Sequence, residues 1–128
     1  MDPVVEAFER GEVRSPFDHR EHLRVAWGYL RAMRLEEALA RFTAALQRVA
    51  AAKGVPGKYH ATMTWGFLLA LHEAMEETGP ADDLEALLRA RPDLLDHRTG
   101  VLLGHWTPEE LGSPRARARF VLPRRARA

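Results

Sequence analysis

The apolar residues of this chain recur every three or four positions through most of its length, which is the spacing of amphipathic helices. The pattern predicts an all-α protein, a small helical bundle of about four main helices followed by short C-terminal helical turns. The expected helices cover 3–10, about 19–33, 35–53 and 57–78, and a shorter one begins near Leu84 and ends before Pro92.

Several helix ends carry their own signals. Asp18 is placed to cap the helix that begins at His19. The run 107–110, Thr-Pro-Glu-Glu, has the form of a capping box with proline at the first helical position. Ser113, also followed by proline, predicts another cap. The length of 128 residues suits one domain with a single core, so we expect 1–128 to be a single helical domain.

Two histidines stand at the front of the helix expected from His19. His19 and His22 are three positions apart and share the face that carries the apolar stripe. His60 has the corresponding place in the first turn of the 57–78 helix. Because short connections make successive long helices antiparallel, these two helices begin at the same end of the bundle. We therefore expect the three imidazoles to meet there.

Imidazole is a suitable ligand for zinc, iron, nickel and copper. The sequence therefore predicts a mononuclear divalent-metal site on His19, His22 and His60, with zinc as the first expectation and iron, nickel or copper as alternatives. Three protein ligands leave a coordination position for water or a small-molecule substrate, as in metal-dependent enzymes. Tyr59 and Thr64 are the candidate catalytic residues. Tyr59 can hydrogen-bond or ionise beside the metal, and Thr64 can orient an imidazole or a bound water.

The fourth ligand is open among Asp18, His97 and His105. His72 lies three turns beyond His60, about 18 Å along the helix axis at 1.5 Å per residue, so we assign it to packing or to the surface. A single inward-facing histidine is more often a packed or capping residue than a ligand, and this plainer interpretation applies to each of the three. Only their shared position favours a metal.

The amino-acid composition excludes several classes of function. The chain has no cysteine, which excludes disulfides, thiol catalysis and thiolate ligands. Its N-terminus lacks the basic and apolar regions of a signal peptide, and no apolar run reaches the roughly 18–20 residues that span a bilayer. The sequence therefore predicts a cytoplasmic protein with no membrane partner.

Charge is distributed unevenly, although the net charge is only +1. Residues 113–128 carry six arginines and no acid, which leaves 13 basic against 18 acidic residues in the rest of the chain. A basic tail can bind nucleic acid, but the acidic body argues against that function here. The apolar run 120–123 interrupts the arginines, so we expect 113–128 to be a basic segment that packs on the body or is partly flexible.

The helix expected over 57–78 is apolar around most of its circumference, which favours a central position. Trp65, Leu68 and Leu69 form a second apolar flank beside its inner face. An exposed flank of this kind suits a non-enzymatic interaction module, in which two copies form a homodimer through this helix. This is the main alternative to the metal-binding function.

The motifs FDHREHLRVAW, KYHATMTW and LGSPRARARFVLP follow one another in the chain. In this order of motifs the chain resembles small uncharacterised bacterial all-helical proteins with the pattern HxxH…KYHxTxT, and the resemblance covers nearly the whole chain. It implies no catalytic residues. Three histidines in a small bundle are also similar, at the level of the fold alone, to the DinB/YfiT-like metal-binding bundles.

Overall fold

The computed structural model of the chain describes residues 2–13, 18–78, 83–96 and 101–123. Within these ranges it contains α-helices and short 3-10 helices (η) but no β-strand, so the predicted all-α class is confirmed. Across the same ranges, none of the helices has the length and apolarity of a membrane span. In chain order the elements are α1 (Pro3–Glu9), α2 (His19–Ala32), α3 (Leu35–Ala52), η1 (Pro56–Lys58), α4 (Ala61–Thr78), α5 (Leu84–Ala90), η2 (Pro92–Leu95), η3 (Val101–Gly104), α6 (Pro108–Leu111) and α7 (Pro114–Ala118).

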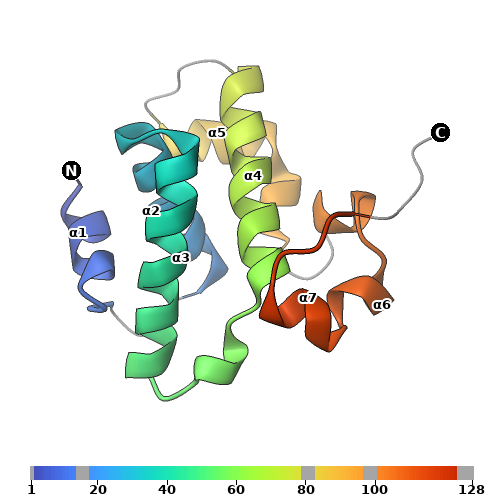
Figure 1. The fold of residues 1–128 in the computed structure, drawn as a ribbon. Helices are drawn as coiled ribbons and strands as arrows, with labels where there is room; N and C mark the ends of the chain where they lie inside the picture. The colour runs from blue at the N-terminus through green and yellow to red at the C-terminus, as the bar shows by residue number, and fades with distance from the viewer. Residues whose placement is uncertain (1, 14–17, 79–82, 97–100, 124–128) are drawn as a thin grey trace.

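The three long helices α2, α3 and α4 pack against one another and form the centre of the fold (Figure 1). Helix α1 lies against α2 and α3, while η3 and α7 lie against the other side of α4. Helix α5 and η2 also contact α4. Helix α4 therefore has neighbours on several sides, as its apolar circumference predicts.

An aromatic cluster holds α1 on the bundle. Phe8 stacks on Phe42 of α3 with ring centroids 5.4 Å apart, and Tyr29 of α2 meets both rings edge-on. All three side chains are buried. Gly28 lets α1 approach α2 closely, because a Cβ at this position would overlap the Val5 side chain. Two apolar residues of α1, Val5 and Phe8, thus fix this short helix on the two long ones.

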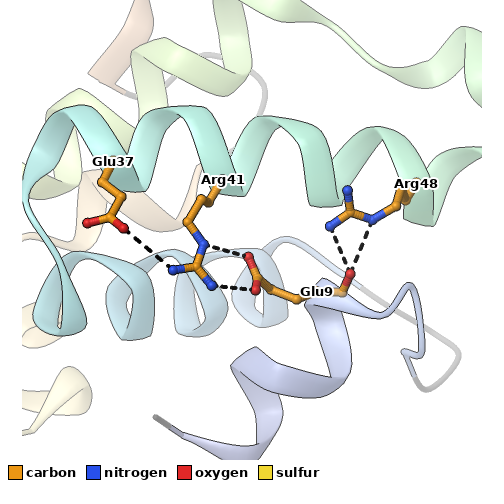
Figure 2. Close-up of polar contacts among 4 residues, drawn as sticks. All are labelled: Glu9, Glu37, Arg41 and Arg48. Carbon is orange, nitrogen blue, oxygen red and sulfur yellow. Dashed lines mark hydrogen bonds and ion pairs between the residues drawn. The ribbon is translucent and has the colours of Figure 1, made fainter.

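A polar network also joins α1 to α3 (Figure 2). The Glu9 carboxylate accepts two hydrogen bonds from Arg41, at 2.6 and 3.1 Å, and the Arg41 guanidinium also lies 3.7 Å from the Glu37 carboxylate. Arg48 donates two hydrogen bonds to the backbone carbonyl of Glu9, at 2.8 and 3.1 Å. This carbonyl lies at the end of α1, where it has no helical partner. The neighbouring guanidinium of Arg41 holds the pKa of the Glu9 carboxyl below its ordinary value.

The C-terminal segment forms a second apolar cluster on α4. The Trp106 ring lies against Gly66, where even a Cβ would crowd it. Trp106 donates from Nε1 to the Val121 carbonyl at 3.0 Å. Thr62 of α4 donates to the Arg119 carbonyl at 2.9 Å and accepts from the Val121 N–H at 3.2 Å. The chain through residue 121 is thereby held against the start of α4.

The apolar flank of α4 that we expected at a dimer surface is partly covered within the chain. Leu68 is 1% exposed and belongs to the main core, and Leu69 is partly buried. Trp65 packs against Phe120 with ring centroids 5.4 Å apart and donates from Nε1 to Thr43 Oγ1 at 3.0 Å. The C-terminal segment returns to α4 and covers part of this flank, a contact that helical periodicity does not reveal. Because Trp65 and Leu69 remain partly exposed, a homodimer through this helix stays a prediction.

The predicted caps are present in the structure. Asp18 accepts the N–H of Glu21 at 3.0 Å and so caps α2. Thr107 and Glu110 form the reciprocal capping box at the start of α6, and Ser113 caps α7. Local sequence therefore determines these helix ends.

Candidate functional site

The start of α4 decides where His60 lies. We expected this helix to begin near Gly57, but Pro56–Lys58 forms η1 and α4 begins only at Ala61. His60 therefore precedes the helix instead of lying in its first turn. Its Nδ1 accepts a hydrogen bond from the Met63 N–H at 3.1 Å, which is the bond that an N-cap side chain makes to the third helical residue. His60 is a helix cap.

The other ring nitrogen of His60 is bonded as well. Nε2 lies 2.6 Å from the carbonyl oxygen of Leu111, and because Nδ1 is an acceptor, Nε2 carries the proton and donates it. The hydrogen bonds thus assign the neutral tautomer protonated at Nε2. The residue is only 9% exposed. A metal ion can bind this imidazole only by displacing one of the two hydrogen bonds.

The His60 ring also forms part of the wall of a pocket of about 480 Å³. The pocket lies between the start of α2, the second half of α3 and the first half of α4. All five residues that we predicted for the site line it, so the fold brings them to one place. Its polar and charged lining consists of Asp18, His19, His22, Lys53, Lys58, Tyr59, His60 and Thr64, and its larger apolar residues include Leu23, Phe42, Leu46, Met63, Phe67 and Leu68.

The histidines share this pocket without forming a metal cluster. Among the residues that the structure describes, no three histidine, aspartate or glutamate side chains are grouped so that they could hold one metal ion. His19 is anchored in the wall, since its Nε2 lies 2.8 Å from the Leu94 carbonyl oxygen and its ring meets Phe67 edge-on at 4.7 Å between centroids. A metal site on His19, His22 and His60 stays a prediction.

The fold separates the candidates for a fourth ligand. Asp18 lines the pocket while its Oδ1 caps α2. His105 is exposed, packs edge-on against Trp106 and does not line the pocket. His97 lies outside the described residues. His72 is partly buried on α4, away from the pocket lining. Of the candidates that the structure describes, Asp18 alone is placed beside the predicted ligands.

Tyr59 and Thr64 belong to a group of hydroxyls at the pocket wall. Burial raises the pKa of Tyr59 above its ordinary value, while hydrogen bonding with the Thr43 and Thr64 hydroxyls acts in the opposite direction. Thr64 Oγ1 donates to the His60 carbonyl at 2.7 Å. Tyr59 is therefore protonated at neutral pH, so it can donate a hydrogen bond or a proton to a bound molecule.

Three residues near this site were missed by sequence reasoning. Thr43 lies in a regular amphipathic helix, and its neighbours in the sequence do not distinguish it. Lys53 and Lys58 did carry a signal, because they are the only two lysines among the 19 basic residues of the chain. Both line the pocket. The rarity of lysine in an arginine-rich chain therefore marks this region.

No family model matches the chain, and no curated protein or solved structure is significantly similar to it. These comparisons leave the resemblance in motif order untested. What the pocket can do therefore follows from its own residues.

Proposed function

We propose that this protein binds a small organic molecule in the pocket between α2, α3 and α4. The supporting observation is a pocket of about 480 Å³ in which apolar side chains of α2, α3 and α4 converge with polar side chains at or near the ends of these helices. Its volume falls within the range typical of ligand sites, roughly 300–1,000 Å³. The side chains of His22 and Tyr59 would contact the polar part of the ligand, and Tyr59 would serve as a proton donor if the ligand is a substrate.

The size of the pocket argues against an ordinary packing defect. Protein interiors are close-packed, and voids larger than a water molecule are few. Leu46, Met63 and Phe67 line this space and remain partly exposed. A bound molecule with an apolar body would bury them, which stabilises the complex by the hydrophobic effect.

A pocket-filling substitution tests this proposal. Ala50 lines the pocket from α3, whereas Ala44 is exposed on the same helix and does not line it. Binding of the neutral fluorescent probe phenyl-naphthylamine should be saturable in the unmodified protein. We expect Ala50→Trp to abolish this binding and the matched control Ala44→Trp to retain it. Equal binding by both variants would show that the probe does not occupy the pocket, and the proposal would fail.

Divalent-metal binding is the second candidate function. The observation that favours it is the position of His19 and His22 beside Asp18 on one pocket wall, which provides nitrogen and oxygen donors suited to zinc, iron, nickel or copper. The His19–Leu94 hydrogen bond resembles the bond that a metal-bound imidazole makes through its other nitrogen. Such a metal would activate a water molecule or polarise the ligand.

Elemental analysis of protein purified without a histidine tag tests the second candidate. We expect about one metal ion per chain, held less tightly by His19→Ala and His22→Ala. Both His60 nitrogens are bonded to backbone groups, so His60→Asn distinguishes two ligand sets. Loss of the metal would assign His60 as the third ligand, as the sequence predicts, and retention would assign the site to His19 and His22 with Asp18. Metal-free protein that also fails to take up added zinc would rule out this function while leaving the small-molecule pocket intact.

A further inference from the structure

Both lysines of the chain line the pocket. Lys53 directly follows α3, and Lys58 is the last residue of η1. Within the described ranges, neither ammonium group takes part in an ion pair or a hydrogen bond. By contrast, four arginines form ion pairs with carboxylates: Arg20, Arg24, Arg41 and Arg91.

A third positive charge lies beside η1, the element that ends at Lys58. Arg117 of α7 donates to the Gly57 carbonyl at 3.0 Å, which places its guanidinium beside η1. Tyr59, which burial keeps protonated, adds a hydrogen-bond donor in the same region. Of the pocket-lining residues only Asp18 carries a carboxylate, and it comes from the start of α2. The lysine-bearing wall therefore combines cations and a donor.

The rest of the lining is largely apolar, with Phe42 and Leu46 from α3 and Phe67 from α4. We infer that the ligand of this pocket is an amphipathic organic anion, whose apolar body contacts these side chains and whose acidic group lies near Lys53 and Lys58. The inference rests on the proposed function and adds the charge and the orientation of the ligand.

A purely structural use of the lysines explains only part of the arrangement. Lys53 lies at the C-terminal end of α3, where a cation offsets the negative end of the helix dipole. Lys58 and Arg117 lie outside α3, so the dipole does not account for them. Two lysines that line a partly apolar pocket and have no carboxylate partner among the described residues favour an anionic ligand.

Two fluorescent probes with the same aromatic body test the inference. Anilinonaphthalene sulfonate carries an acidic group, and phenyl-naphthylamine does not. We expect the anionic probe to bind about tenfold more tightly at low ionic strength, with the advantage shrinking as salt is added. The double variant Lys53→Gln/Lys58→Gln should weaken the anionic probe about three- to tenfold and leave the neutral probe unchanged.

Two control variants accompany this measurement. Lys53→Arg/Lys58→Arg keeps both charges and should retain most of the affinity for the anionic probe. Arg89→Gln removes an exposed cation from α5, outside the pocket, and should change neither probe. The lysines are solvent-exposed, so the variants should keep their helical content, which circular dichroism checks.

The possible results separate the two proposals. Equal affinities for the two probes, together with no effect of Lys53→Gln/Lys58→Gln, would overturn the anionic ligand while leaving a small-molecule pocket in place. Failure of Ala50→Trp to exclude the neutral probe would instead overturn the proposed function itself.

Discussion

His60 donates its Nε2–H to the Leu111 carbonyl oxygen at 2.6 Å and so ties the start of α4 to the end of α6. The same ring accepts the Met63 N–H through Nδ1, and His60 is among the residues that line the pocket. A single imidazole therefore caps the central helix, fastens the C-terminal segment and shapes the candidate site. This arrangement explains why a histidine occupies this position without any need for a metal.

Substitution of His60 tests this structural role. His60→Ala removes both hydrogen bonds and leaves the Leu111 carbonyl without this donor, so we expect the free energy of unfolding to fall by about 2–3 kcal/mol. His60→Asn can still accept the Met63 N–H as an N-cap but is too short to reach Leu111, and it should lose only about 1 kcal/mol. Urea denaturation measures both values.

The outcome also separates the capping role from metal ligation. If His60→Ala and His60→Asn unfold at the same urea concentration as the unmodified protein and both lose a bound metal, His60 is a ligand and not a cap. If His60→Asn is more stable than His60→Ala, the side-chain acceptor at the start of α4 accounts for the difference in the free energy of unfolding.

Local patterns predicted much of the fold. Helical periodicity located the long helices, and the caps at Asp18, Thr107 and Ser113 were identified from residue type and spacing. These features depend on a few neighbouring residues, so a single sequence contains the information. The common location of His19 and His22 with His60 followed from helix lengths and short connections.

Features that depend on distant residues were missed. The return of the C-terminal segment brings Phe120 onto Trp65, although 55 positions separate them, and no periodicity marks that contact. The hydrogen-bonding partner of His60 at Leu111 is equally remote. Whether an inward-facing histidine binds a metal or a backbone carbonyl depends on such contacts. The sequence therefore predicted that the three histidines share one region of the fold, while the chemistry of that region stays a prediction.

Close approach of α1 to α2 predicts the effect of Gly28→Ala. The added methyl group would overlap the buried Val5 side chain. We therefore expect an overpacking cost of about 2–3 kcal/mol, in the upper part of the usual range, which exceeds the gain of about 1 kcal/mol in helix propensity. We expect the free energy of unfolding to fall by about 1–2 kcal/mol. In a Val5→Ala background the same substitution should cost less, and a double-mutant cycle measures the difference.

Gly57→Ala is the matched control for this prediction, because a Cβ at Gly57 meets nothing within 4 Å. Its effect on stability should stay within about 0.5 kcal/mol. Equal effects of the two glycine substitutions, or an unchanged cost of Gly28→Ala after removal of the Val5 methyl groups, would contradict the close packing of α1 on α2.

The Glu9–Arg41 contact predicts a pH dependence of stability. Because Arg41 lowers the pKa of Glu9 in the folded protein, its contribution is present above the ordinary glutamate value of 4.5 and is lost as the pH falls through the folded value. Glu9→Gln should lower the urea midpoint at neutral pH, and the difference from the unmodified protein should shrink in acid. Glu36→Gln is the control, since the Glu36–Arg34 pair is highly exposed and should contribute little. A difference that is independent of pH would contradict the ionic contribution.

Titration of Tyr59 tests whether the pocket holds a protonated phenol. The chain has two tyrosines, and burial is the leading cause of the raised pKa at both. In Tyr29→Phe, where Tyr59 alone remains, the ultraviolet absorbance of tyrosinate should appear above the ordinary value of 10.0 in the folded protein and near that value in urea. Since the raised pKa belongs to the folded state, its contribution to stability is present below pH 10.0 and is lost as the pH rises further.

Binding of the anionic probe should raise the pKa of Tyr59 further, because a bound anion next to Tyr59 disfavours the phenolate. Ionisation near 10.0 in the folded variant would contradict the burial of Tyr59 in the pocket wall.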